Sequence, residues 1–227
     1  IFRLSAAGFI IGLGWLGYAG LDQYRVTVPT VGGTYIEAIV GTPQLINPAF
    51  SSVNEVDADL TRLIYSGLMR YDDRQRLVPD LAARFSVSED KKTYTFDLRR
   101  DVTWHDGAPF TAKDVVYTID TIQNEQVGSP LFITFQGIGV KALDDYRVEF
   151  TLKEVFAPFL SSLTVGILPE HVWAEVASDR VRLHKKNLEP VGTGPYKVKS
   201  LAKDGAGGIH QYVLERFGGY YRSGPYI

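Results

Sequence analysis

The sequence predicts a fold of the α/β class (mixed α+β), and three observations lead to this prediction. Apolar and polar residues alternate over 94–98, which is typical of a strand with one buried face. Apolar residues recur at helical spacing over 57–68 and again over 112–122. Asp144-Asp145 separates two β-rich runs, as in a hairpin. The 227 residues, 45% of them hydrophobic, suffice for one large domain or two small ones.

The first segment of the chain, residues 4–21, contains no charged side chain. As a helix it would span about 27 Å, close to the roughly 30 Å of a bilayer core. Trp15 and Tyr18 would then lie toward one end as interfacial aromatics. We expect residues 1–24 to be a transmembrane anchor, with a cleavable signal peptide as the alternative. A buried core helix is a third interpretation, which the glycines of this segment disfavour.

The elements that follow can be expected in chain order. The polar residues 22–33 predict a short tether, and the β-rich run 34–40 predicts the first strand. A helix is expected over 57–68, with Asp57 as its N-cap. The alternating segment 94–98 predicts a strand with one buried face.

Residues 102–122 predict a strand–turn–helix corner. Asp106-Gly107 is a turn pair, because glycine adopts positive φ without a Cβ clash. Thr111 is expected to cap the helix, with Asp114 completing a capping box. His105 and Asp106 are adjacent, so on an extended chain their side chains point to opposite sides. A catalytic dyad is therefore disfavoured, although the pair superficially suggests one.

The second half of the chain predicts hairpins and short helices. We expect, in order, strands over 137–143 and 147–152, an apolar segment over 156–163, a short helix over 169–176, an irregular segment over 180–190, and a hairpin of 196–201 with 209–217.

Composition and motifs exclude several functions. The net charge is −2 with no long Lys/Arg cluster, so no nucleic-acid partner is expected. Cysteine is absent, which rules out disulfides, thiolate metal sites and a cysteine nucleophile. The four histidines are scattered, and neither a phosphate-binding loop nor a Gly-x-Ser-x-Gly elbow occurs. We therefore expect no metal, no cofactor and no catalytic residues, and an extracytoplasmic domain that is not an enzyme.

An ordered set of motifs resembles a known family. The motifs are Leu45–Pro48 (LINP), Ile64–Asp72 (IYSGLMRYD), Val78–Ala82 (VPDLA), Tyr94–Arg99 (YTFDLR), Trp104–Val115 (WHDGAPFTAKDV), Gly192–Tyr196 (GTGPY), and Leu214–Arg216 (LER) with Tyr220-Tyr221. Together they resemble the family 5 extracellular solute-binding proteins of ABC importers, the dipeptide/oligopeptide-binding group. Each motif alone is only moderately specific, and their shared order makes the resemblance specific.

The resemblance implies a periplasmic-binding-protein-like type II fold, of which this chain would contain the first lobe and its extra subdomain. Residues 25–52 and 165–227 would belong to lobe I, and residues 53–164 to the inserted subdomain. The implied function is binding of peptides between two lobes, mainly through backbone hydrogen bonds, and delivery to a permease. The alternatives are a receptor or sensor of the same fold for a nickel chelate, haem or a sugar, and an extracytoplasmic hydrolase.

The resemblance also implies a binding segment. The loop after Asn47-Pro48 lies along the cleft in the family, which maps ligand contact here to Phe50, Ser51, Ser52, Val53 and Asn54. A second segment, Ser129, Pro130 and Leu131, is expected to reach the same cleft. A plain surface loop is the alternative interpretation of 50–54.

Three departures from the family pattern stand out. The lipid-bearing cysteine is absent, and Phe217-Gly-Gly219 replaces the usual Asn-Pro-Asp. The second lobe, which supplies the acidic partner for a peptide's amino terminus, does not correspond to any part of this sequence.

Overall fold

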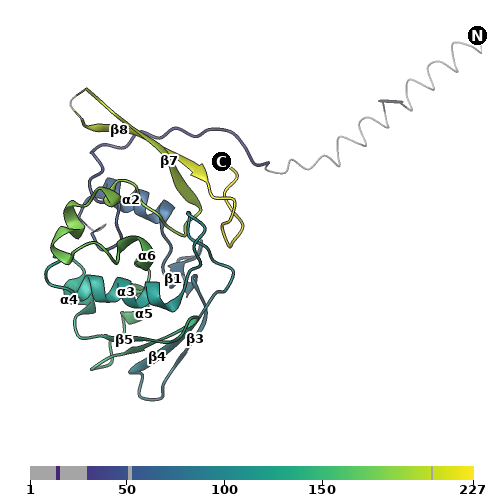
Figure 1. The fold of residues 1–227 in the computed structure, drawn as a ribbon. Coiled ribbons are helices and arrows are strands. Elements are labelled where there is room, and N and C mark those ends of the chain that lie inside the picture. Colours follow the sequence, from purple (N-terminus) through teal and green to yellow (C-terminus); the bar gives the residue numbers. More distant parts are fainter. Residues whose placement is uncertain (1–13, 16–29, 51–52, 206) are drawn as a thin grey trace, which may run out of the picture. The chain divides into compact units, whose positions relative to one another are not determined.

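The computed structural model describes residues 14–15, 30–50, 53–205 and 207–227. The chain divides into two compact units, one of residues 1–34 with Tyr226 and one of residues 35–225 with Ile227. In the first unit Gly14 and Trp15 are helical and exposed, and the rest of the predicted anchor lies outside the described residues. Among the residues described, no helix is both long and apolar enough to cross a membrane. The second unit carries the elements below (Figure 1).

Helix α2 (Glu55–Ile64) starts two residues earlier than predicted. Its N-cap is Asn54, whose Oδ1 accepts a backbone N–H of the first turn at 3.0 Å. Asp57, the predicted cap, is instead a buried helical residue, and its carboxylate accepts the N–H groups of Gln44 at 2.8 Å and Leu45 at 3.0 Å. The prediction of Asp57 as N-cap is therefore wrong, because its carboxylate serves the preceding segment. The helix also ends earlier than predicted, because the next residue is extended.

The predicted strand over 34–40 is wrong as well. None of these residues is in a strand, and Ile36 and Val40 are 87% and 100% exposed. A strand needs a hydrogen-bonded neighbour, and within the described part of the chain this segment has none. High β-propensity alone did not place it in a sheet.

The second unit contains a four-stranded antiparallel sheet. Its strands are β3 (Ala82–Val87), β4 (Thr93–Leu98), β5 (Gly139–Asp144) and β6 (Arg147–Thr151), in the order β3-β4-β6-β5. Burial alternates residue by residue along β4, which confirms the strand predicted over 94–98. The hairpin of β5 and β6 confirms the one predicted around 144–145. β3 was not predicted, since most of its side chains are exposed and lack alternation.

The corner before α3 (Ala112–Gln123) is largely as predicted. Gly107 has φ +92°, as the turn requires, and the Thr111 N–H donates to the Asp114 carboxylate at 2.8 Å, so the capping box is confirmed. The strand expected at 102–104 is reduced to one isolated bridge, between Thr103 and Pro109.

Several short elements lie outside the four-stranded sheet and the helices α2 and α3. They are β1 (Met69–Tyr71) paired with β2 (Leu77–Pro79), α4 (Phe132–Phe135), α5 (Phe159–Ser162), α6 (Glu170–Trp173), and the 3₁₀ turns η1 (Ser178–Leu183) and η2 (Lys185–Asn187). The helix predicted over 169–176 is confirmed by α6. The segment expected to be irregular, 180–190, is organised by the two 3₁₀ turns. Strands β7 (Tyr196–Lys203) and β8 (Ile209–Arg216) confirm the last hairpin.

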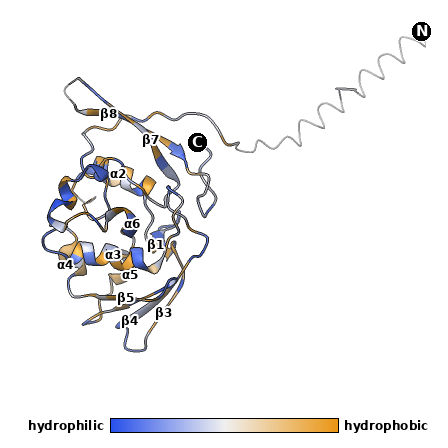
Figure 2. Ribbon diagram, viewed as in Figure 1, coloured by the Kyte–Doolittle hydropathy of each residue, from blue (hydrophilic) through white to orange (hydrophobic). Residues whose placement is uncertain are grey.

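One apolar core connects these elements. Helix α3 lies over the sheet and packs against β5 and β6 (Figure 1). Both α2 and α3 carry apolar and polar residues along their length (Figure 2), as expected of helices with one buried face. The rings of Phe96, Phe150 and Phe159 are buried, with Phe150 5.6 Å from Phe96 and 5.5 Å from Phe159 between centroids. The buried apolar residues form a single cluster from Ile46 to Val181.

Candidate ligand-binding site

The predicted binding loop begins with a tight turn at Asn47-Pro48. The Asn47 Oδ1 accepts the Ala49 N–H at 2.9 Å, and its backbone carbonyl accepts the Phe50 N–H at 2.9 Å. An asparagine side chain that bonds the backbone two residues on is typical of such turns. The Phe50 carbonyl then accepts the Val53 N–H at 3.1 Å. The described part of the loop is therefore held by its own hydrogen bonds.

A buried pair of asparagines fastens this turn to the segment of η1 and η2. The Asn47 Nδ2 donates to the Asn187 Oδ1 at 2.9 Å, and the Ile46 N–H donates to the Asn187 carbonyl at 3.0 Å. The Asn187 Nδ2 in turn donates to the carbonyls of Val181 at 2.8 Å and Arg182 at 3.2 Å. Both asparagines are at most 1% exposed. Each buried polar atom of Asn187 thus has a partner, as buried amides require.

The second predicted segment contacts the same turn. The Ser129 hydroxyl donates to the Ala49 carbonyl at 2.7 Å and also accepts the Leu131 N–H at 3.2 Å. Ser129 is buried, Pro130 is exposed and Leu131 is half-buried. The structure therefore brings together the two segments that the sequence resemblance had assigned to one cleft.

The predicted contact residues differ in what they expose. Phe50 is 1% exposed and both of its backbone polar groups are bonded within the turn. Ser51 and Ser52 lie outside the described residues. Val53 is 59% exposed, whereas Asn54 uses its side chain to cap α2 and to donate to the Thr42 carbonyl at 3.0 Å. Ligand contact by these residues stays a prediction. Of Phe50, Val53 and Asn54, Val53 has the most exposed side chain.

Sequence reasoning missed Arg182. Its guanidinium lies over the Phe50 ring, 5.8 Å from the ring centroid, within the usual range of a cation–π contact. Arg182 is exposed, and the next residue, Leu183, is 88% exposed. No sequence signal pointed to this pairing, because the residues are far apart in the chain and contact through the fold.

Three segments cross at the end of α2: the segment at Ile64, the glycine segment 192–194 and the segment at His105. The Gly194 N–H donates to the Ile64 carbonyl at 2.7 Å, and a Cβ on Gly192 would lie 1.9 Å from that same carbonyl oxygen. Only glycine fits this approach. His105 closes the crossing: its Nδ1 accepts the Gly192 N–H at 3.2 Å, so its Nε2 donates to the Gly194 carbonyl at 3.0 Å. Burial lowers the pKa of His105 to about 4, so the ring is neutral at pH 7.

His105 and Asp106 do not form a dyad. His105 is engaged with the glycine segment, whereas the Asp106 carboxylate meets the Nε2 of His171 at 2.8 Å. The His171–Asp106 pair is half-exposed, and the His171 ring packs edge-on against Trp104 at 6.2 Å. The prediction that His105-Asp106 belongs to a structural corner is confirmed.

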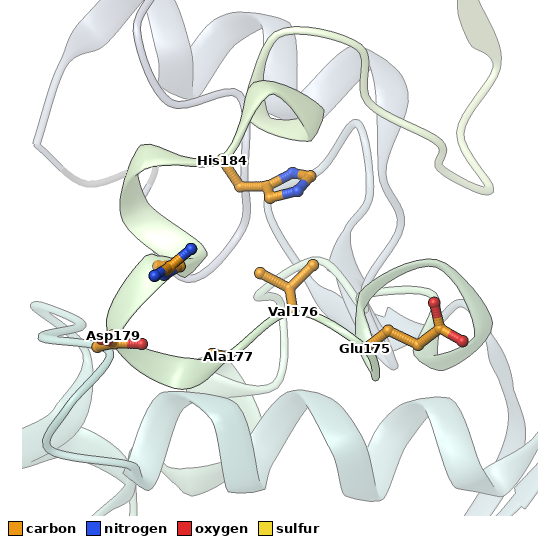
Figure 3. A pocket seen from close by; sticks show the side chains of 6 residues that line it. Glu175, Val176, Ala177, Asp179 and His184 are labelled. Carbon is orange, nitrogen blue, oxygen red and sulfur yellow. The ribbon is translucent and has the colours of Figure 1, made fainter.

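A pocket of ≈ 470 Å³ lies beside η1 (Figure 3). Its lining residues are Glu175, Val176, Ala177, Asp179, Arg180 and His184. Val176 points toward His184, while Glu175 and Asp179 lie at opposite ends (Figure 3). The Nδ1 of His184 already accepts the Lys186 N–H at 3.3 Å. Among the described residues no group of three or more His, Cys, Asp or Glu is placed to hold a metal ion.

Solved structures share this architecture. The oligopeptide-binding protein AppA from Bacillus subtilis, in complex with a nonapeptide, matches with a TM-score of 0.78 and 27% identity over 88% of this chain and 39% of that chain. NikZ from Campylobacter jejuni, in complex with Ni(L-His), matches with a TM-score of 0.70 and 31% identity over 86% of this chain and 37% of that chain. The class is thereby defined: the chain has the type II periplasmic-binding fold.

Sequence comparisons identify the family. The model for bacterial extracellular solute-binding proteins, family 5 (middle), matches residues 76–227. The chain belongs to this family, which confirms the resemblance seen in its motifs. A dipeptide-binding protein of Escherichia coli is 33% identical over 217 residues, which cover 86% of this chain and 39% of that relative. The chain thus spans about two fifths of the length of this relative.

Proposed function

We propose that the protein containing this chain is the extracytoplasmic substrate-binding component of an ABC importer and that it binds peptides. It captures them in a cleft between two lobes and delivers them to the permease subunits. Its N-terminal segment holds it at the cytoplasmic membrane. In this proposal residues 25–52 and 165–227 contribute to lobe I and residues 53–164 to its extra subdomain.

The observation that carries the proposal is the match to AppA, a protein solved with a nonapeptide, at a TM-score of 0.78. The sequence similarity to a dipeptide-binding protein supports the same ligand class. The two comparisons are of different kinds, one of backbone geometry and one of residue identity, and both point to peptides.

The binding mode follows from the chemistry of a peptide. An extended peptide presents backbone N–H and C=O groups at regular intervals, so a receptor that pairs its own backbone with them can accept many sequences. The predicted segments, 50–54 and 129–131, contribute one wall of the cleft. Ser129 supports this wall through its bond to the Ala49 carbonyl, and the exposed Val53 contacts the ligand.

A second candidate ligand is a nickel chelate, which the match to NikZ with Ni(L-His) favours. A chelate brings its own donor atoms, so the protein needs few ligands for the metal. Haem and sugars are further candidates, as is a sensor role. A hydrolase is the weakest alternative, because the sequence contains no nucleophile elbow.

Mass spectrometry of the molecules that co-purify with the natural full-length protein tests the proposal. Mixed short peptides are expected, and their release on denaturation should be stoichiometric. Recovery of a single nickel chelate or one sugar in place of peptides would overturn peptide binding and leave a solute receptor of the same fold.

A further inference from the structure

Arg182 is an exposed cation that forms no ion pair within the described structure. Its guanidinium covers the Phe50 ring at 5.8 Å, and it forms no ion pair with any carboxylate of the described residues. Two other exposed arginines do form ion pairs: Arg62 meets Asp59 at 2.8 Å, and Arg84 meets Asp97 at 2.6 Å. The Arg182 guanidinium therefore lies near the Phe50 ring and has no carboxylate partner among the described residues.

The position of Arg182 is set by a buried network. Its carbonyl accepts the Asn187 Nδ2 at 3.2 Å, and the same amide group bonds the Val181 carbonyl at 2.8 Å. Asn187 is tied to Asn47 at 2.9 Å, so the backbone of Arg182 is fastened to the turn that begins the predicted binding loop. A side chain that lies over a buried ring, on a backbone held by buried amides, is preorganised, and less conformational entropy is lost when it binds.

The surroundings of Arg182 expose apolar side chains. Leu183 follows it and is 88% exposed, and Val53, which bonds the Phe50 carbonyl through its N–H, is 59% exposed. A ligand that covered Leu183 and Val53 would remove their apolar surface from water, which is favourable. Covering them would remove water from the guanidinium and strengthen its interaction with an anion.

We propose that Arg182 determines specificity by binding a carboxylate of the ligand. The inference rests on the proposed function, since a peptide has a carboxylate at its C-terminus and can have others on Asp or Glu side chains. The guanidinium matches the two oxygens of a carboxylate with parallel N–H donors, which a lysine could not do from the same position.

Arg180 provides a matched control. It is exposed and lies on the same 3₁₀ turn, but its side chain lines the pocket of Figure 3 instead of covering Phe50. Its removal changes net charge by the same amount as removal of Arg182. A general electrostatic effect would therefore affect both variants equally, whereas a direct contact would affect only Arg182→Gln.

The test measures binding to the natural full-length protein and to its Arg182→Gln, Arg182→Lys and Arg180→Gln variants. The probes are three mixtures of tri- to pentapeptides: free-acid peptides without Asp or Glu, C-terminally amidated peptides with one Glu, and amidated peptides without acidic groups. Enrichment of each mixture on the immobilised protein is quantified by mass spectrometry, and circular dichroism checks that each variant is folded.

We expect the wild type to enrich one carboxylate-bearing mixture about tenfold over the neutral one, as one charge-assisted contact would produce. This preference should disappear in Arg182→Gln, fall in Arg182→Lys and persist in Arg180→Gln. Preference for the free-acid mixture identifies the C-terminus as the source, and preference for the Glu mixture identifies a side chain. Equal enrichment of all mixtures, or a preference unchanged in Arg182→Gln, overturns the inference while peptide binding stands. Enrichment of none overturns the proposed function itself.

Discussion

The sheet region, formed by β3 to β6 with α3, and the loop region, formed by 46–54 with 178–194, are stabilised by different kinds of contact. The sheet region is held by apolar side chains such as Phe96 and Phe150, which are fully buried. The loop region is held by buried polar groups, chiefly Asn47, Asn187 and Ser129, and by glycine contacts with the Ile64 carbonyl. Apolar packing tolerates local adjustment, whereas a hydrogen-bonded network loses its partners when one member is removed.

The difference matters for the proposed site. Hydrogen bonds are directional, so a loop fastened by them holds its neighbours in one geometry. The surface around Val53 and Arg182 is positioned in this way. The sheet region, in contrast, is stabilised by its buried apolar side chains.

The largest effect is expected in the sheet region, for Phe150→Ala. The ring contacts Phe96 and Phe159 and is 0% exposed, so its removal leaves a cavity. We expect the free energy of unfolding to fall by about 3–5 kcal/mol, measured by denaturant titration. Phe156→Ala, at a ring that is 37% exposed, is the control and should cost about 1 kcal/mol. If the two variants lost the same unfolding free energy, the apolar core would not be the main stabilising feature of the sheet region.

In the loop region the largest effect is expected for Gly192→Ala. A Cβ would lie 1.9 Å from the Ile64 carbonyl oxygen, and this backbone atom cannot move aside without shifting α2. The expected loss of unfolding free energy is about 3 kcal/mol. Gly218→Ala, where a Cβ would have no atom within 4 Å, should change stability by no more than about 0.5 kcal/mol. A Gly192→Ala protein as stable as this control would disprove the close crossing.

A smaller effect is expected for Asn187→Ala. It removes the acceptor of the Asn47 Nδ2, which then lies buried without a hydrogen bond, and it removes one donor each from the Val181 and Arg182 carbonyls. We expect a loss of about 2 kcal/mol. Hydrogen exchange should speed up for the Ile46 amide, which donates to Asn187.

The control for this variant is Asn124→Ala. Asn124 is half-buried and its side-chain amide donates to the Ser178 hydroxyl at 3.0 Å, so a loss below about 1 kcal/mol is expected. If both variants lose the same stability, the buried amide network is not what distinguishes the loop region.

The smallest effect is a pH dependence that His105 confers on the loop region. Burial lowers its folded-state pKa to about 4, against about 6.5 in the unfolded chain. Between these values the unfolded state binds the proton more readily, so stability decreases as pH falls from 6.5 toward 4. When the pH is lowered from 7 to 5, the free energy of unfolding of His105→Gln should fall by about 1–2 kcal/mol less than that of the wild type. Parallel stability–pH curves would show that the histidine does not titrate as described.

Local patterns predicted the elements whose signals lie within a few residues. The alternation over β4 and the capping box of α3 were readable, because each depends on neighbours in the chain. The N-cap of α2 was misplaced by three residues, since both Asn54 and Asp57 are good caps and the choice depends on what Asp57 bonds across the fold. The strand expected over 34–40 failed because propensity does not supply a partner strand.

For the candidate site, family resemblance predicted the segments 50–54 and 129–131, and the structure places Ser129 against Ala49. The sequence alone determined the class of fold, most elements and the family, because these follow from local periodicity and ordered motifs. Only the tertiary structure decided that Phe50 is buried, that Arg182 covers it, and that Asn47 meets Asn187 across 140 residues of chain. Such contacts join positions with no local relation, so the path of the whole backbone must be known before they can be seen.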